Sequence, residues 1–205
     1  MSAHHDEQGA RGSVSSWNLP NILTAARIVM VPFFVWAFVL GGPFGQDSLL
    51  ARWVAFGLFA LAMYTDKLDG DIARARGLVT DFGKIADPIA DKLLTGAALV
   101  VFCLLGELWW WVTIVILVRE WGITLMRLIV IRYGVMPASK GGKLKTVLQA
   151  AGIGLLLMPL VPVLGDWWAW VGWAVIGAAL VVTVVTGIDY VRQAVVLRSQ
   201  ARDAR

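Results

Sequence analysis

The stretch DKLDGDIARARGLVTDFGKIADPIAD, residues 66–91, decides how the rest of the chain must be arranged. It places six aspartates, two arginines and two lysines between long apolar runs. An ionised side chain at the centre of a bilayer costs about 2.5–3.5 kcal/mol on insertion scales, so carboxylates grouped here need a cationic partner. The pattern indicates two helices that hold a divalent metal and act on a phosphate.

The spacing within this stretch predicts one charged face on each helix. The first helix carries, within one arc, Asp66, Asp69, Gly70, Ala73 and Arg74. The second carries Gly83, Asp87 and Asp91 at four-residue steps, which also places them on one face. Carboxylates from two facing helices suit one or two hard cations, which prefer oxygen ligands. Two alternatives are solvated loop charges and a purely structural cluster of ion pairs.

The composition predicts an integral membrane protein. Of 205 residues, 59% are hydrophobic, far above the balance of a soluble domain. We expect an all-α fold with six transmembrane helices of roughly 17–25 residues each. Their expected positions are residues 22–40, 49–64 (continuing through Arg74), 82–105, 108–131, 146–164 and 170–188. The single cysteine excludes an internal disulfide.

The ends of the chain differ from this apolar body. Residues 1–16 are small and polar and are expected to be disordered. Residues 17–27 mix Trp17 and leucines with polar side chains, which predicts an amphipathic juxtamembrane segment. One domain should cover residues 17–192, and residues 193–205 should form a basic tail.

The distribution of lysine and arginine predicts the orientation. Nearly all loop Lys and Arg lie in the two termini and in the connectors after the second and fourth spans, whereas the opposite loops hold little beyond Arg52. The positive-inside rule then places both termini in the cytoplasm. The aspartate site opens to the same side, where nucleotides are found.

Further polar residues lie outside the aspartate stretch. Asn21 and Thr24 recur at a three-residue step and can share a helix face, either as interfacial caps or beside a ligand. Arg119 and Arg127 lie two turns apart within an apolar run, which suggests a functional site, although an ion pair such as Arg119–Glu120 is the alternative. Lys143 and Lys145 could bind an anionic substrate or anchor the connector to anionic headgroups.

The pattern D-x-x-D-G-x-x-A-R, then eight residues, then G-x-x-x-D-x-x-x-D resembles the signature of the CDP-alcohol phosphotransferase family and matches it at every defined position. The resemblance implies a six-span homodimer that uses two Mg²⁺ or Mn²⁺ ions and releases CMP from a CDP-linked donor. It makes Asp66, Asp69 and Asp87 metal ligands, and Asp91 a ligand or the general base. It places CDP beside Asn21, Thr24, Gly70, Ala73, Arg74 and Gly83.

Other stretches refine the expected substrates. TDFGKIADPIADKL, VREWGITLMRL, GGKLKTVLQ and NLPNILTAARIVMVP resemble bacterial members of the family that transfer a phosphatidyl group from CDP-diacylglycerol to sn-glycerol 3-phosphate. That resemblance implies a bacterial cell membrane location, with Arg119, Arg127, Lys143 and Lys145 around the acceptor phosphate. The alternatives are a cardiolipin synthase of the same family, with phosphatidylglycerol as acceptor, and, more distantly, a small cation transporter. No nucleic-acid partner is expected.

Overall fold

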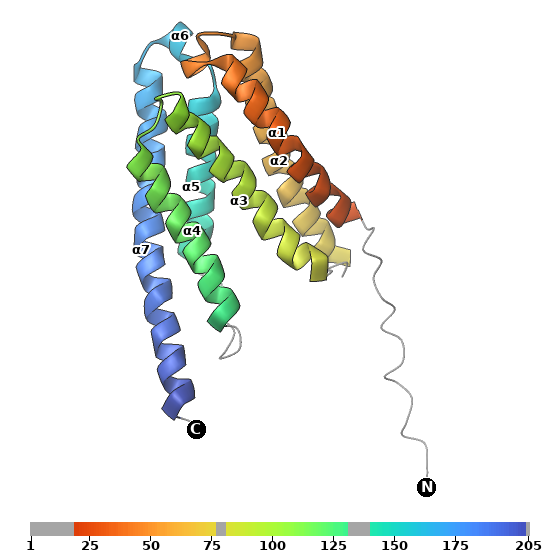
Figure 1. Ribbon diagram of the computed structural model, residues 1–205, viewed down its shortest axis with the longest axis vertical. Helices are drawn as coiled ribbons and strands as arrows, with labels where there is room; N and C mark the ends of the chain where they lie inside the picture. Colours follow the sequence, from red (N-terminus) through yellow and green to blue (C-terminus); the bar gives the residue numbers. More distant parts are fainter. Residues whose placement is uncertain (1–18, 77–80, 131–139, 204–205) are drawn as a thin grey trace.

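The computed structural model describes residues 19–76, 81–130 and 140–203, which are helical apart from short turns (Figure 1). It describes the backbone alone at residues 19–20, 69, 71–76, 81–85, 127–130, 140–141 and 197–203. The expected disordered segment 1–16 lies outside the described residues. These three ranges contain no strand, which confirms the all-helical fold class.

Six long helices account for most of the described residues. They are α1 (Leu19–Gly41), α2 (Leu49–Arg76), α3 (Asp81–Leu104), α4 (Trp110–Val130), α5 (Lys140–Leu157) and α7 (Trp167–Asp203). Two short pieces, η1 (Pro43–Gly45) and α6 (Val161–Leu164), lie in the α1–α2 and α5–α7 connections. The first four long helices begin and end within three residues of the positions expected from the sequence.

The fifth and last long helices differ from the expectation. α5 begins at Lys140, so it includes basic residues that the sequence analysis assigned to a connector. It ends at Leu157 instead of residue 164, because Pro159 has no N–H to continue the helical hydrogen bonding. α7 is one helix through Asp203, and it therefore extends into the segment expected as a tail.

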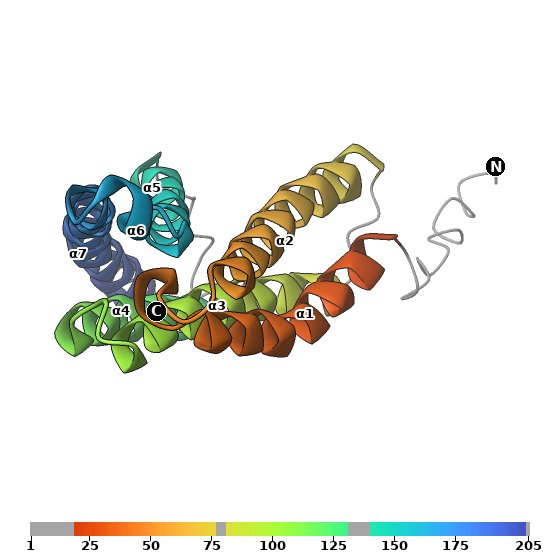
Figure 2. The same cartoon turned by 90° about the horizontal axis from the view of Figure 1, so that it is seen from above.

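The helices form two groups that meet near one end of the molecule. α1 packs along α2 and α3, while α5 and α4 both pack against α7. The view in Figure 2 shows α1, α2 and α3 on one side and α4, α5 and α7 on the other. α3 contacts α4 and α5, so it joins the two groups and carries Asp87 and Asp91 between them.

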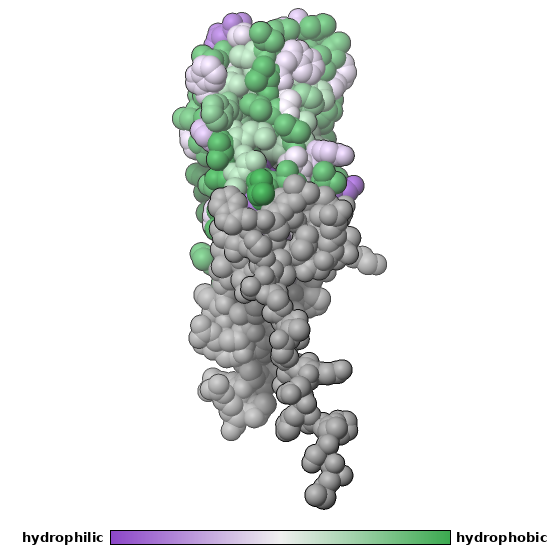
Figure 3. Space-filling model, turned by 90° about the vertical axis from the view of Figure 1, so that its right-hand side faces the viewer, coloured by the Kyte–Doolittle hydropathy of each residue, from purple (hydrophilic) through white to green (hydrophobic). Residues whose placement is uncertain are grey.

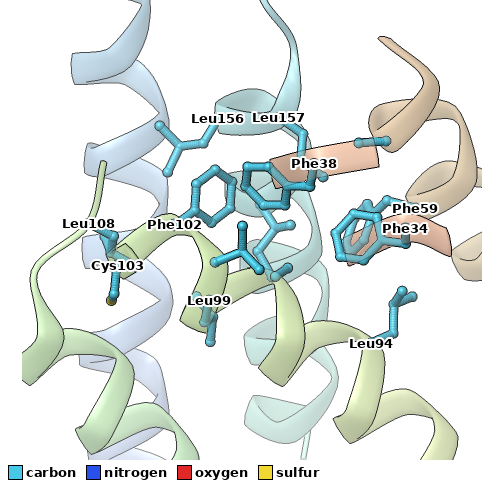
Figure 4. Close-up of a cluster of buried hydrophobic side chains, with 14 of the residues drawn as sticks. Phe34, Phe38, Phe59, Leu94, Leu99, Phe102, Cys103, Leu108, Leu156 and Leu157 are labelled. Atoms are coloured by element: carbon cyan, nitrogen blue, oxygen red, sulfur yellow. The ribbon is translucent and has the colours of Figure 1, made fainter. Parts of the chain in front are cut away.

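The hydrophobic core lies where α1, α2, α3 and α5 meet (Figure 4). Its largest fully buried apolar side chains include Phe34, Phe38, Leu94, Leu99, Phe102, Ile153 and Leu157. The rings of Phe38 and Phe102 meet edge to face with centroids 4.8 Å apart. Such aromatic pairs contribute about 0.5–1.5 kcal/mol beyond the area they bury. The core therefore fixes the two helices α1 and α3 against each other.

A buried ion pair lies beside this core. Arg52 of α2 donates from Nη1 and Nη2 to the two carboxylate oxygens of Glu107, at 2.8 and 2.6 Å. It also donates to the carbonyl oxygens of Gly42, Leu156 and Leu157. The sequence analysis grouped Arg52 with loop charges; it is instead fully buried within α2. Burial raises the pKa of Glu107, and its bonds to Arg52 partly offset that effect.

The outer surface is strongly apolar. Figure 3 shows green, hydrophobic side chains over most of the described part of one face. Within the described residues, three segments are long and apolar enough to cross a membrane: Asn21–Gly41, Leu49–Leu68 and Trp167–Val196. Several large apolar side chains on other helices are also exposed, for example Val118 at 68%. This surface is typical of a protein whose helices contact lipid.

Candidate active site

α1 brings the two aspartate-bearing helices together. The Thr24 hydroxyl donates to Asp87 Oδ1 of α3 at 2.5 Å. One turn further on, Arg27 Nη1 donates to Asp66 Oδ1 of α2 at 2.6 Å. Thr24 and Arg27 share a helix face because they are three residues apart. This face of α1 thus holds one carboxylate from each of the two helices singled out by the sequence.

The neighbouring predicted residues lie around these contacts. Asn21 is buried one turn before Thr24 on α1. Gly70 is partly buried one turn after Asp66 on α2. Five further predicted site residues have side chains outside the described residues: Asp69, Ala73, Arg74, Gly83 and Arg127. Their backbone positions place the first three on α2, Gly83 on α3 and Arg127 on α4.

Asp66 is only partly enclosed by its ion pair. The Arg27 side chain is 1% exposed, whereas that of Asp66 is 37% exposed. Arg27 occupies one side of the carboxylate, and the exposed side remains accessible to a ligand. A metal ion or the cationic part of a substrate could therefore approach Asp66 without displacing the core.

Asp91 borders a cavity of about 440 Å³ formed by α3, α4, α5 and α7. The charged side chains in its wall are Asp91, Lys92, Arg119, Glu120, Lys143 and Lys145. Three of the four basic residues predicted to bind the acceptor phosphate thus lie around one cavity with the predicted general base. Because the basic side chains outnumber the acidic ones, the cavity suits a small anion that also carries a hydroxyl group.

A buried ion pair forms part of this wall and was not predicted from the sequence. Lys145 Nζ of α5 donates to Glu120 Oε1 of α4 at 2.8 Å. The sequence alternative paired Glu120 with its neighbour Arg119; the structure pairs it with Lys145 instead. The sequence contained one signal for this pair: Glu120 is the one acidic residue within the apolar run 108–131, so it needs a basic partner.

Arg119 connects the cavity to α7. Its Nε donates to the Thr183 carbonyl oxygen at 3.1 Å, and its Nη2 donates to the Thr186 hydroxyl at 2.8 Å. Its guanidinium also lies 5.9 Å from the centre of the Tyr190 ring. Arg119 therefore holds α4 against α7 while it borders the space in front of Asp91.

A hard cation needs several oxygen ligands from the described carboxylates. Asp87 and Asp91 lie one turn apart on α3, and Asp66 of α2 and Asp87 bond to the same face of α1. Among the described side chains no three His, Cys, Asp or Glu residues form a compact metal-binding group, and Asp69 is not among them. The donors are all carboxylates from two facing helices, which fits Mg²⁺ or Mn²⁺.

Comparison with known proteins points to the same chemistry. The sequence profile of the CDP-alcohol phosphatidyltransferase family matches residues 17–185. A Mycobacterium tuberculosis (strain H37Rv) protein named probable phosphatidylglycerophosphate synthase is 49% identical over 95% of this chain and 90% of its own length. The Bacillus subtilis (strain 168) CDP-diacylglycerol–glycerol-3-phosphate 3-phosphatidyltransferase is 36% identical over 85% of this chain and 93% of its own length.

A third relative matches a shorter part of the chain. A cardiolipin synthase (CMP-forming) from Oryza sativa subsp. japonica is 41% identical, but over 42% of this chain and 24% of its own length.

Proposed function

The chain belongs to the CDP-alcohol phosphatidyltransferase family, and we propose that it acts as a phosphatidylglycerophosphate synthase. It transfers the phosphatidyl group from CDP-diacylglycerol to sn-glycerol 3-phosphate and releases CMP. Relatives that carry this name align with nearly the whole chain. The structural observation that carries the proposal is the cavity in which Asp91 faces Arg119, Lys143 and Lys145.

The nucleotide part of the donor binds on the α1–α2–α3 side. Asn21, Thr24, Gly70, Ala73, Arg74 and Gly83 contact CDP in this proposal. The support is that Thr24 already lies against Asp87, next to Arg27 and Asp66. Small residues at Gly70, Ala73 and Gly83 allow a flat ligand to approach the helix backbones closely.

Members of this family generally use divalent metal ions. Asp66, Asp69 and Asp87 would hold Mg²⁺ or Mn²⁺, with Asp91 as a further ligand or as the base. Bound divalent ions would neutralise charge on the diphosphate as its bridging bond breaks. Thr24 and Arg27 hold two of these carboxylates in place.

The acceptor binds in the cavity at Asp91. Arg119, Arg127, Lys143 and Lys145 surround its phosphate, and its terminal hydroxyl, at the other end of the glycerol from the phosphate, points toward Asp91. The hydroxyl oxygen attacks the phosphorus next to the diacylglycerol and forms a new P–O bond. The bond from that phosphorus to the bridging oxygen breaks, and CMP leaves with that oxygen. Asp91 accepts the hydroxyl proton, as a general base does.

The membrane arrangement follows from the same proposal. The six long helices all cross a bacterial cell membrane, with both termini and the active site on the cytoplasmic side, and the chain forms a homodimer. The exposed apolar surface and the three apolar segments support membrane insertion. A site at this depth lets CDP-diacylglycerol keep its acyl chains in the bilayer while glycerol 3-phosphate enters from water.

The second candidate is a cardiolipin synthase, favoured by the partial match to the rice protein. A cavity with several basic residues favours an acceptor with a free phosphate over phosphatidylglycerol. The decisive experiment measures CMP release from CDP-diacylglycerol by the purified chain with a panel of acceptors: glycerol 3-phosphate, phosphatidylglycerol, inositol phosphate and serine. Release with glycerol 3-phosphate alone supports the proposal, and release with phosphatidylglycerol alone replaces it with the second candidate.

A further inference from the structure

A second hollow lies outside the cavity at Asp91. It is an apolar groove of about 670 Å³ between α4 and α7. Its wall consists of apolar residues, among them Val118, Gly122, Gly187 and Ile188, together with Arg119 and Arg192. Only two of these residues are charged, so a ligand of the groove must be apolar over most of its length.

Two glycines line this groove, and they differ in the space beside them. A Cβ atom built on Gly122 meets no atom within 4 Å, whereas one built on Gly187 lies 3.2 Å from Arg119 Cγ. The space at Gly122 is therefore free, and the wall at Gly187 is formed by the stem of Arg119. A larger side chain at position 122 would fill the groove without a clash at its Cβ atom.

The groove lies at the surface of a segment that is apolar enough to cross a membrane, Trp167–Val196. Val118 and Ile188 in its wall are 68% and 52% exposed. Apolar side chains exposed at this depth contact hydrocarbon, so acyl chains are the molecules present at high concentration around the groove.

The position of Arg192 identifies the other part of the ligand. Arg192 is exposed and lies one turn beyond Ile188, toward the C-terminal end of α7. Arginine binds phosphate oxygens with paired N–H donors. A molecule that fits both ends has an apolar chain along α4 and α7 and an anionic phosphate at Arg192. We propose that this groove binds an acyl chain of an anionic phospholipid of the bilayer, with its headgroup phosphate at Arg192.

A second copy of the chain fits the groove less well. In a two-fold symmetric dimer the same patch faces itself. Both copies of Arg192 would then belong to one interface, and two like charges in the same interface oppose association. The charge at the end of the groove therefore favours an anionic lipid over self-association through this face.

The proposed headgroup position at Arg192 is separate from the contacts assigned to the donor nucleotide. The contacts assigned to the donor nucleotide belong to α1, α2 and α3, whereas the groove belongs to α4 and α7. The two regions share a boundary at Arg119, which borders both the groove and the cavity at Asp91. A lipid chain in the groove would pack on the stem of Arg119 and steady its bonds to Thr183 and Thr186.

The test uses the full chain in detergent, titrated with phosphatidylglycerol or phosphatidylcholine, with bound phospholipid counted by native mass spectrometry. We expect Gly122→Leu to lose the tightly bound phospholipid. The matched control is Gly57→Leu, because a Cβ at Gly57 on α2 also meets nothing within 4 Å but lies away from the groove. That control should retain the lipid. Arg192→Gln should reduce the preference for phosphatidylglycerol about five-fold, the effect of one basic residue near anionic headgroups.

Each remaining outcome is informative. Equal phospholipid retention by Gly122→Leu and the unaltered protein overturns the proposal, and so does a change of oligomeric state in Gly122→Leu, which would identify a second copy as the occupant. If Gly122→Leu does not fold, Ile188→Trp replaces it. This substitution fills the groove from α7 and should also lose the tightly bound phospholipid. The count of bound lipid requires no catalysis, so it stands or falls separately from the proposed transferase activity.

Discussion

The described part of the chain contains two ion pairs in which both side chains are buried, and their surroundings differ. The side chains of Arg52 and Glu107 are both 0% exposed, and those of Lys145 and Glu120 are 9% and 7% exposed, so burial alone does not distinguish the pairs. Arg52 bonds both Glu107 oxygens and three carbonyls, and its guanidinium lies 4.2 Å from the centre of the Phe38 ring. In the described part of the chain, Lys145 Nζ donates one hydrogen bond, to Glu120.

This difference separates a structural pair from a pair that forms part of a site. Arg52 has partners on all sides and stabilises the junction of α2, α5 and the turns beside them. A lysine has three N–H donors, so Lys145 retains donors that can face the cavity it borders. The same chemistry thus serves packing at one place and, in the proposed function, ligand binding at the other.

The largest expected effect concerns the aspartates of the proposed metal site. Treatment with EDTA, or the substitution Asp87→Asn, should abolish CMP release, because each removes the proposed metal or one of its ligands. Added Mg²⁺ or Mn²⁺ should restore the EDTA-treated protein but not Asp87→Asn. Near-normal turnover after EDTA, with no metal added back, would end the metal proposal.

The substitution Asp91→Asn should lower kcat by about 10²–10⁴-fold, the usual contribution of a general base. The KM for glycerol 3-phosphate should change less, because the basic wall of the cavity is intact. Steady-state CMP release checks this, with the melting temperature as a control for folding. A kcat within a few-fold of the unaltered protein would remove Asp91 from the role of base.

Substitutions in the Arg52–Glu107 pair should lower the stability of the protein and leave its catalytic rate unchanged. Arg52→Met should cost about 3–5 kcal/mol of folding free energy, because it leaves the Glu107 carboxylate buried without its partner. Thermal unfolding in detergent measures the loss. The double variant Arg52→Met, Glu107→Leu should recover part of it, and CMP release per folded molecule should stay unchanged. A higher KM for the acceptor in Arg52→Met would contradict the separation of the two pairs into a structural pair and a cavity pair.

At the site, Lys145→Met should raise the KM for glycerol 3-phosphate by roughly 10–100-fold, as expected for a lost charge-assisted hydrogen bond of about 1.5–3 kcal/mol. The KM for CDP-diacylglycerol should be unaffected. Unchanged KM values together with a lower melting temperature would indicate that Lys145, like Arg52, mainly supports packing.

The smallest effect is expected two residues earlier on α5. Lys143 lines the same cavity but is exposed to solvent. Water screens an exposed charge, so Lys143→Met should raise the KM for glycerol 3-phosphate by no more than about five-fold, or 1 kcal/mol. It is the matched control for Lys145→Met, since both remove one positive charge from the same helix. An effect as large as that of Lys145→Met would show that burial is not the deciding difference.

The sequence alone determined the helical class and selected the aspartates proposed as metal ligands, because helical spacing places residues three and four apart on one face. Asp66, Asp87 and Asp91 could be selected in this way without any knowledge of packing. The same local rule predicted the first four long helices closely. It failed at the end of α5, where Pro159 interrupts an apolar run that is long enough to continue.

Only the tertiary structure decided which charges meet across helices. Glu120 and Lys145 are 25 residues apart in the chain, and Arg52 and Glu107 are 55 apart. Hydrophobic periodicity states which face of a helix is buried but not which neighbour it buries against. The division of the buried charges into a structural pair and a cavity wall therefore follows from helix packing, which no local pattern in the sequence specifies.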